Sequence, residues 1–444
     1  MDLLIRNAEL VLTPDGILSN QDIGITDGRV SGIWDSNRSA EQAPEPGEPA
    51  GRVMDATRRA VVPGWKNAHT HAAMTLLRGY ADDMRLQPWL QEAIWPLEAR
   101  LTGEDIYWGT RLAALEMIRG GTSFANDMYF NTPEVTRAFR DAGLRAGVGL
   151  AMFDFGDSER RARLMDEVDQ LLDEWQQENV ARTPGRPQLV RPVIAPHSIY
   201  TCSGELLQWA ARRAEDTGLV FHIHMNETQQ EVEDCLALHG RRPFEWLDTL
   251  GVLDRIAGRG IAAHGIWLDE SEMRLAAEAG LTIVHNPASN MKLASGVMDW
   301  QALRDAGIPL MLGPDGVASN NNLDMFDEMR LAALLQKVHT GDPTRLTAQE
   351  AVELATGGLS TVFADHGLSS GIAVGSAADL QLIDLDAPQL VPLHNLESHL
   401  VYAANASVVD SLIVGGEPVM AGRAVPDEEE IIAEARRCAA RLTG

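Results

Sequence analysis

Histidines at the ends of apolar runs constrain the fold of this chain more than any other feature. In the middle of the sequence, short β-type runs alternate with helix-length stretches, and most of the runs end at a histidine or an aspartate. Eight strands alternating with helices predict a parallel (β/α)8 barrel of the TIM type. Because the carboxyl ends of barrel strands face one pocket, these distant residues are expected to converge there. The strands are expected to end near His71, Asp127, Met152, His197, His224, His264, His285 and Asp315.

Both ends of the chain have β character of another kind. Asp27-Gly28 and Gly415-Gly416 each lie between two apolar runs, which indicates hairpins. Strands this short cannot bury a core alone, so we expect them to pair into one small composite β domain built from both chain ends. The sequence thus predicts a composite β domain over 1–60 and 371–426, a catalytic barrel over 61–370 and a C-terminal helix over 427–444, with a Pro/Glu/Gly-rich loop at 36–52.

The charge balance excludes several classes of partner. Lys and Arg number 37 against 64 Asp and Glu, which gives a formal net charge of −27. Nucleic acids and anionic membranes bind basic surfaces, so we expect neither as a partner. No apolar run is long enough to predict a transmembrane helix. Three scattered cysteines without a CxxC pair favour a reducing, cytoplasmic location.

Two histidine pairs share one spacing. His69 and His71 flank a threonine at the end of the first barrel strand. Residues i and i+2 of a strand point to the same face, so both rings can reach one metal ion, and imidazole suits zinc and iron alike. His222 and His224 repeat the spacing on the fifth strand. One of these two can also ligate, and for His222 a buried, hydrogen-bonded role is favoured.

Other polar residues fall at the same predicted edge of the barrel. Glu227, on the loop above the fifth strand, could donate and accept protons beside a metal. Asp315 could bind the metal and accept a proton from water, or it could simply form a turn. His264 could ligate a second metal or orient the attacking hydroxide. His197 could contact substrate or be an ordinary strand-end histidine.

Taken together, these motifs resemble the amidohydrolase superfamily, and within it the 5'-methylthioadenosine/S-adenosylhomocysteine deaminases. The resemblance covers nearly the whole chain, from the N-terminal strand to the hairpin at Gly415. Triazine hydrolases and guanine-type deaminases share much of the same scaffold. The segments that carry the resemblance are residues 63–71, 77–83, 94–98, 195–202, 222–228, 286–296 and 316–324.

The resemblance implies one divalent metal ion, usually zinc, with iron as the alternative. Binuclear members of this barrel type bridge their metals with a modified lysine on the fourth strand. The run 189–197 contains no lysine, so a single-metal site is favoured. The ligands that the resemblance implies are His69, His71, His224 and Asp315.

The resemblance also implies a reaction. The 6-amino group of an adenosine-type nucleoside would be removed by hydrolysis, leaving ammonia and the inosine analogue. 5'-Methylthioadenosine, S-adenosylhomocysteine and adenosine are the expected substrates. Glu227 would protonate the purine ring and shuttle protons. His264, together with Asp315, would orient the attacking water and help to deprotonate it.

Three residues are implied as substrate contacts. His197 would lie near the ring and sugar, and Trp89 would pack against the base. Glu98 would accept hydrogen bonds from both ribose hydroxyls, because a carboxylate can accept from a vicinal diol in bidentate fashion. A triazine or a bare guanine has no such diol, so Glu98 discriminates between these substrate classes. Pro314 departs from the family pattern, which usually has threonine before the metal aspartate, and this puts fine specificity in question.

Two other functions remain open at this stage. The same site could serve an s-triazine hydrolase or deaminase, or a free-nucleobase deaminase of the guanine type. A more remote alternative is a non-catalytic scaffold in an oligomer. Relatives are often dimers or tetramers, so we expect a homo-oligomer.

Overall fold

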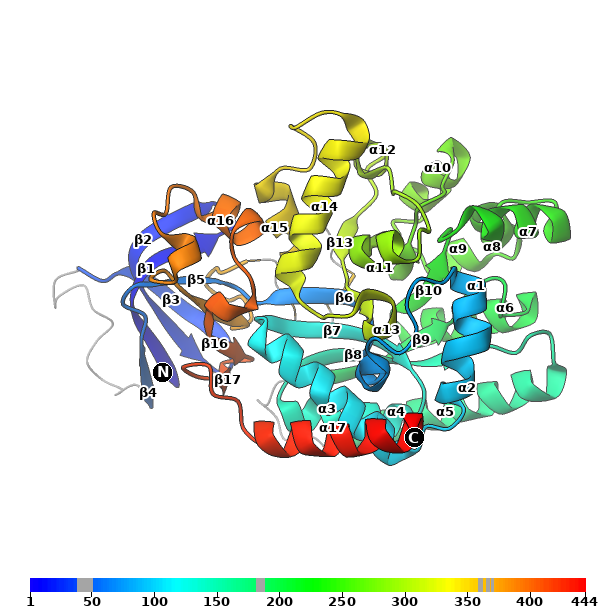
Figure 1. The fold of residues 1–444 in the computed structure, drawn as a ribbon, viewed down its shortest axis with the longest axis horizontal. Coiled ribbons are helices and arrows are strands. Elements are labelled where there is room, and N and C mark those ends of the chain that lie inside the picture. Colours follow the sequence, from blue (N-terminus) through cyan, green and yellow to red (C-terminus); the bar gives the residue numbers. More distant parts are fainter. Residues whose placement is uncertain (38–50, 181–187, 358–361, 365–367, 369–370) are drawn as a thin grey trace.

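Two sheets organise the chain (Figure 1). The computed structural model describes residues 1–37, 51–180, 188–357, 362–364, 368 and 371–444, so most of the loop expected at 36–52 lies outside the described residues. The larger sheet is parallel, with strand order β13-β12-β11-β10-β9-β8-β7-β6-β14. Its strands are β6 (Trp65–His71), β7 (Thr122–Tyr129), β8 (Arg145–Met152), β9 (Val190–Pro196), β10 (Phe221–Met225), β11 (Gly260–His264), β12 (Thr282–His285), β13 (Leu310–Leu312) and β14 (Asp315–Gly316).

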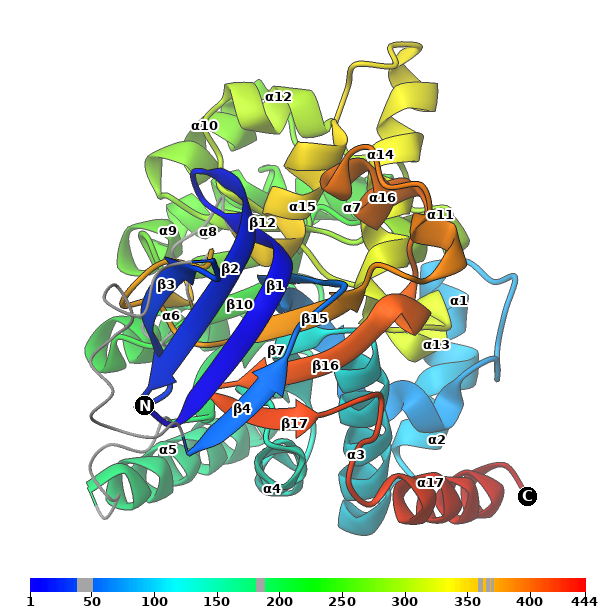
Figure 2. The same cartoon turned by 90° about the vertical axis from the view of Figure 1, so that its left-hand side faces the viewer.

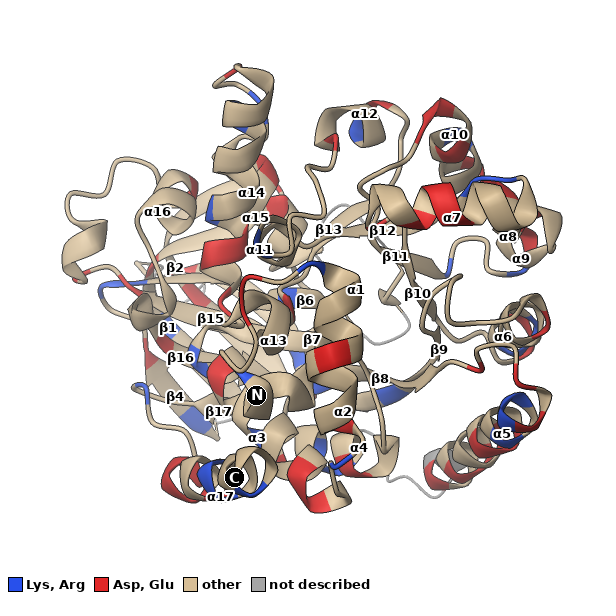
Figure 3. Ribbon diagram, turned by 45° about the vertical axis from the view of Figure 1, so that its right-hand side comes forward, with Lys and Arg blue, Asp and Glu red and all other residues tan. Residues whose placement is uncertain are grey.

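Helices follow these strands in turn, which confirms the expected α/β fold on a parallel sheet. Acidic and basic residues lie mostly on the outer helices, α5, α7 and α10 among them (Figure 3). The helices are α1 (Leu86–Pro88), α2 (Trp95–Glu98), α3 (Gly103–Arg119), α4 (Thr132–Ala142), α5 (Ser158–Val180), α6 (Gly204–Thr217), α7 (Gln229–His239), α8 (Pro243–Thr249), α9 (Val252–Arg255), α10 (Glu270–Glu278), α11 (Pro287–Lys292), α12 (Trp300–Asp305), α13 (Val317–Asn320), α14 (Met325–Thr340), α15 (Ala348–Thr356), α16 (Leu396–Tyr402) and α17 (Glu428–Thr443).

The eighth strand is broken, where the sequence predicted one continuous strand ending at Asp315. Pro314 lies at the break, and a proline has no N–H to donate to a strand ladder. The first part, β13, pairs with β12, whereas β14 pairs with β6 at the other end of the sheet. A single segment, 310–316, therefore joins both ends of the curled sheet, an arrangement consistent with a barrel.

The second sheet takes its strands from both ends of the chain. Its order is β17-β16-β15-β5-β1-β2-β3, with β4 paired to β1, and Figure 2 shows the blue and the orange-red strands side by side. Asp27, Gly28, Gly415 and Gly416 all have positive φ, as a two-residue hairpin of type I′ requires. The strands are β1 (Leu3–Thr13), β2 (Gly16–Thr26), β3 (Arg29–Asp35), β4 (Arg52–Asp55), β5 (Arg59–Pro63), β15 (Leu380–Asp384), β16 (Val409–Val414) and β17 (Glu417–Met420).

Helix α17 closes the chain by packing against α3. Its buried residues Ala435, Cys438 and Leu442 form a cluster with Leu76, and Arg441 pairs with Asp105 of α3. None of the helices in the described part of the chain combines the length and apolar character that crossing a bilayer would need.

Candidate metal centre and active site

The carboxyl ends of the parallel strands surround a cavity. The polar residues expected at the site share this cavity, except His69, which lies just behind it and is fully buried. Trp89 belongs to a π-helical turn (Trp89–Ile94) between α1 and α2, and π turns recur at functional sites. The cavity is lined by His71, Trp89, Glu98, His197, His224, Glu227, His264 and Asp315, together with apolar side chains.

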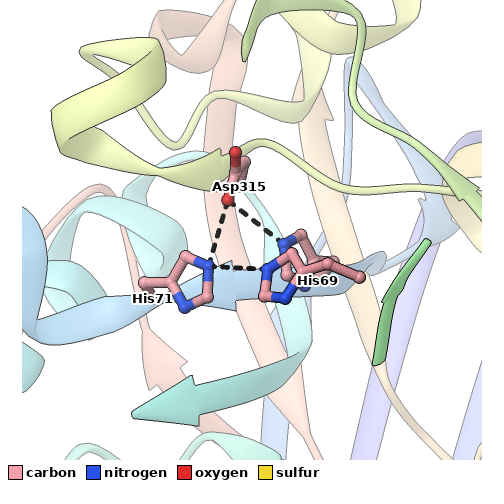
Figure 4. Close-up of side chains that lie close together, drawn as sticks. His69, His71 and Asp315 are labelled. Carbon is pink, nitrogen blue, oxygen red and sulfur yellow. Dashed lines mark hydrogen bonds and ion pairs between the residues drawn. The ribbon is translucent and has the colours of Figure 1, made fainter. Parts of the chain in front are cut away.

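Three side chains of the cavity, His71, His224 and Asp315, form a compact cluster with His69 that could hold a metal ion. Figure 4 shows His69, His71 and Asp315 of this cluster. Asp315 Oδ1 lies 3.1 Å from His69 Nε2 and 3.2 Å from His71 Nε2. The fourth member, His224, brings its Nε2 to 3.3 Å from His71 Nε2. One ligand atom from each residue lies within 4.8 Å of the others. The structure thus brings together all four residues that the sequence proposed as ligands.

The hydrogen bonds of two rings show that this cluster fits a cation. His71 Nδ1 lies 2.7 Å from the carbonyl of Met128, and His224 Nδ1 lies 2.7 Å from the carbonyl of His197. A carbonyl oxygen only accepts, so both δ nitrogens donate, and in neutral rings both ε nitrogens then carry lone pairs. The two ε nitrogens lie 3.3 Å apart. Burial lowers the pKa of His71, but its bonds with Asp315 and Met128 outweigh burial and raise it to about 9, so the cluster stabilises a positive charge. Three imidazoles and a carboxylate are donors that suit zinc or iron.

Asp315 is held by hydroxyl groups on its other oxygen. Ser289 Oγ donates to Oδ2 at 2.6 Å and Ser319 Oγ donates at 2.9 Å. Burial alone would raise the pKa of Asp315, but the bonds with His69 and His71 hold it well below its usual value. The side chain is therefore a carboxylate whose Oδ1 is aimed at the ligand cluster.

His222 lies behind the cluster, in the buried, hydrogen-bonded role favoured from the sequence. Its Nε2 lies 2.9 Å from His69 Nδ1, and its Nδ1 lies 3.0 Å from the amide nitrogen of Asn126. Burial lowers the pKa of His222 well below its usual value, so the ring is neutral. Such a contact fixes the orientation of the His69 ring.

Glu227 and His264 lie next to each other beside the cluster, and both carry side chains that can exchange protons. Glu227 Oε2 lies 3.7 Å from His264 Nε2, and Ser295 Oγ donates to Glu227 Oε1 at 3.3 Å. Burial raises the pKa of Glu227, which favours its protonated form. His264 Nδ1 lies 2.9 Å from Asn290 Oδ1, which holds the ring in place. Glu227, which can give up a proton, thus lies next to His264, which can orient water.

Two site residues have backbone conformations that side chains rarely adopt. His264 has a φ of 74° and Asp315 a φ of 64°, both in the left-handed region. Each such conformation costs on the order of 1–3 kcal/mol unless its surroundings hold it. Asn286 Oδ1 accepts from the backbone N–H of His264, and Thr70 Oγ1 donates to the carbonyl of Asp315. Strained backbone conformations of this kind cluster at functional sites, where they direct a side chain into the site.

The expected substrate contacts line the same cavity. Glu98, half-buried at the end of α2, accepts a hydrogen bond at 2.8 Å from the hydroxyl of Tyr129. Burial raises the pKa of Glu98 to about 7. Trp89 is buried and donates its indole N–H to the carbonyl of Ala81. Burial lowers the pKa of His197 to about 3, so this ring meets a ligand in its neutral form.

Several residues of the site have roles that the sequence did not reveal. They are hydroxyl and amide side chains that hold the charged groups, and such residues are common throughout any chain. The only available signal was position, because three of them lie in the run 286–296, one lies in the run 316–324 and one lies directly at a strand end. The residues are Tyr129, Ser289, Asn290, Ser295 and Ser319.

The chain is similar to known proteins over most of its length. The profile described as the amidohydrolase family matches residues 60–419. A 5'-deoxyadenosine deaminase of Methanoregula boonei is 46% identical over 394 residues, which cover 88% of this chain and 86% of the relative. The 5-methylthioadenosine/S-adenosylhomocysteine deaminase 1 of Archaeoglobus fulgidus is 42% identical over 447 residues, or 100% of this chain and 99% of the relative.

A solved structure is similar over the same length. It is that of an adenosine deaminase from Xanthomonas campestris with bound zinc, and it has a TM-score of 0.89 and 36% sequence identity. The match covers 99% of this chain and 98% of the other.

Proposed function

This chain belongs to the amidohydrolase family, and from that premise we propose that it removes the 6-amino group of adenosine-type nucleosides by hydrolysis. It is then a hydrolase acting on a C–N bond, with 5'-methylthioadenosine, S-adenosylhomocysteine and adenosine as substrates. The observation that carries the proposal is that three of the four clustered residues line one cavity together with Glu227, the proposed proton donor, and Glu98, the proposed diol acceptor. The names of the relatives, which are deaminases of such nucleosides, support it.

A divalent metal ion is part of the proposal, with zinc preferred to iron because the similar adenosine deaminase structure contains zinc. Bound there, the ion would lower the pKa of water toward neutrality and so supply hydroxide at pH 7. The residues proposed to hold it are His69, His71, His224 and Asp315.

The protein's own groups then move the protons. Asp315 and His264 take up the proton of the attacking water, which adds to the ring carbon that bears the amino group. Glu227, whose pKa is raised by burial, delivers a proton to the neighbouring ring nitrogen so that no negative charge builds on the ring. The proton held by Asp315 and His264 then passes to the amino group, the C–N bond breaks and ammonia leaves. The hydroxyl proton returns to Glu227, and the oxygen of water remains on the ring as a carbonyl.

Three side chains orient the nucleoside in this proposal. Trp89 packs against the base, and the neutral His197 ring contacts the substrate where ring and sugar meet. Glu98 accepts hydrogen bonds from the two ribose hydroxyls. A substrate held at both the base and the sugar presents its reacting carbon at a fixed position. Orientation of this kind supplies much of an enzyme's rate acceleration.

Some features that the sequence suggested remain proposals. We propose that residues 1–60 and 371–426 form a small separate domain beside a complete (β/α)8 barrel over 61–370. A cytoplasmic homo-oligomer, either a dimer or a tetramer, is also proposed.

The nearest alternative is another reaction at the same metal site, on an s-triazine or a free nucleobase. Neither compound has a diol for Glu98 to bind. The Glu98→Ala variant separates the alternatives, because it should cripple nucleoside turnover and leave the turnover of a bare ring nearly intact.

The test is a panel of absorbance assays on the zinc-loaded protein. Its substrates are 5'-methylthioadenosine, S-adenosylhomocysteine, adenosine, free adenine, guanine and an s-triazine. Turnover confined to the nucleosides supports the proposal, and turnover of the bare rings alone contradicts it. A protein without any activity that also purifies without a divalent metal would be the non-catalytic scaffold instead.

A further inference from the structure

A tyrosine links the barrel to the segment that carries the proposed diol acceptor. Tyr129 is the last residue of β7, and Glu98 is the last residue of α2. The tyrosine hydroxyl donates to Glu98 Oε1 at 2.8 Å, and both side chains line the active-site cavity.

The surroundings of Tyr129 make its hydroxyl a rigid donor. The residue is only 2% exposed, and its ring packs against Phe130 with 5.0 Å between centroids. Phe130 packs in turn on Phe153, at 5.7 Å. Burial raises the pKa of Tyr129 well above its usual value, and the neighbouring Glu98 raises it further, so the hydroxyl keeps its proton. A donor on a packed aromatic ring at a strand end has little freedom to move.

The bond uses only part of the hydrogen-bonding capacity of Glu98. A carboxylate has about four lone-pair sites on its two oxygens. Tyr129 takes one of them on Oε1, which leaves sites on both oxygens for two further donors. A carboxylate fixed in this way is matched to two hydroxyls at one spacing, and a ligand with one hydroxyl leaves a lone pair without a partner.

We propose that Tyr129 is a specificity-determining positioning residue, whose hydroxyl fixes the Glu98 carboxylate so that it selects a ribose with both hydroxyls over 2'-deoxyribose. The inference rests on the proposed nucleoside deamination. Without the bond, the Glu98 side chain is free to rotate toward a single hydroxyl, so the preference for the intact diol weakens while the chemistry at the base is preserved.

The test compares Tyr129→Phe with the wild-type enzyme on adenosine and 2'-deoxyadenosine. Removal of one charge-assisted hydrogen bond is expected to raise the KM for adenosine about tenfold. The kcat should stay within roughly twofold, because the proton-handling groups are untouched. The KM for 2'-deoxyadenosine should change little, so the discrimination between the two nucleosides falls by about tenfold.

A matched control is available on the outer surface of the barrel. Tyr107, on α3, donates its hydroxyl to Asp141 Oδ2 at the same distance, 2.8 Å, and neither residue lines the cavity. Tyr107→Phe also removes one tyrosine–carboxylate bond and should leave the discrimination at its wild-type value. Calorimetric binding of inosine and 2'-deoxyinosine to each variant measures the same preference without turnover.

A double variant separates positioning from a structural effect. In the Glu98→Ala background, Tyr129→Phe should cause no further change in discrimination, since its target is gone. The proposal is overturned if Tyr129→Phe keeps the wild-type discrimination, or if it lowers kcat equally for both nucleosides as a structural defect would. If the wild-type enzyme deaminates neither nucleoside, the proposed function fails and this inference falls with it.

Discussion

His71 Nε2 lies 3.3 Å from His224 Nε2, and the Nδ1–H of each ring donates a hydrogen bond to a backbone carbonyl. Two lone pairs that face each other at this distance repel unless a cation or a proton lies between them. Backbone carbonyls therefore orient both rings so that their ε nitrogens face a cation site. Two serines donate to Oδ2 of Asp315, whose backbone lies in the left-handed region, and leave its Oδ1 facing the histidines.

The close approach of the two ε nitrogens predicts that a metal ion bound there contributes to stability as well as to catalysis. Chelation should lower the melting temperature, because a ligand at a hundred times its Kd stabilises the folded state by about 2.7 kcal/mol. His224→Ala should weaken metal binding by about a hundredfold or more and remove the effect of the chelator. His239→Ala is the control, since this ring stacks on Trp246 of α8, outside the cluster. An unchanged metal content in His224→Ala would exclude the proposed ligand set.

The serine pair on Asp315 predicts a graded loss of metal affinity. Ser289 and Ser319 both donate to Oδ2 and so keep Oδ1 turned toward the histidines. Loss of a contact that orients a ligand costs roughly 10–100-fold in metal affinity. Ser289→Ala and Ser319→Ala should each weaken binding by about tenfold, and the double variant should weaken it further. Competition with a calibrated chelator gives the affinities, with Ser398→Ala on α16 as the control.

Glu227 is predicted to act in the chemical step. Glu227→Gln keeps the size of the side chain and the bond from Ser295, but it removes the transferable proton. General acid–base groups contribute about 10²–10⁴-fold to rate, so kcat should fall within that range while KM and metal content stay close to wild type. Glu233→Gln, on the exposed face of α7, should have no effect. A Glu227→Gln enzyme with near-normal kcat would show that another group protonates the ring.

The ends of the parallel strands show how far the sequence could predict this fold. β6, β8, β11 and β12 end at the predicted residues, whereas β7 runs two residues past Asp127 to Tyr129. Every position of β7 is buried, although the strand mixes polar with apolar residues, so the pattern of side chains does not mark its last residue. The end is set by where the neighbouring strands stop pairing, and that depends on the whole sheet. The extra length of β7 is what places Tyr129 beside Glu98.

The residues of the site likewise divide into those that the sequence could predict and those that it could not. The histidines and Asp315 were predictable because strand ends of one sheet converge, whatever the details of the packing. The roles of Ser289 and Ser319 were not, because each depends on how a short helix returns over the broken eighth strand. Metal binding by the four clustered residues remains a prediction, since proximity shows only that they could share an ion.

A buried lysine predicts how stability depends on pH. Lys66 is almost fully buried and donates to Ser123 Oγ at 2.7 Å. Burial lowers its pKa from 10.5 to about 8, although Asp379 acts in the opposite direction. The folded state therefore binds fewer protons than the unfolded state between pH 8 and 10.5, so the free energy of unfolding rises with pH across that window. Below pH 8 the buried, charged Lys66 lowers the free energy of unfolding by its full amount, about 3 kcal/mol.

Lys66→Met tests this dependence. The variant should be more stable than wild type at pH 7, and its advantage should shrink as the pH rises through 8 toward 10.5. Urea unfolding at several pH values measures the difference, and comparison of the two proteins at each pH cancels the titration of every other group. A difference that is constant with pH would mean that Lys66 titrates normally in the folded protein.

The most direct test of the account is to follow the oxygen and the nitrogen of the reaction. Zinc-loaded protein is incubated with 5'-methylthioadenosine in water enriched in heavy oxygen, and the product is analysed by mass spectrometry alongside an ammonia assay. The account predicts one ammonia released for each nucleoside consumed and one heavy oxygen atom on the purine ring of an inosine analogue that keeps its sugar. A metal-loaded protein that leaves the nucleoside intact, or that cleaves it without releasing ammonia, would contradict the account.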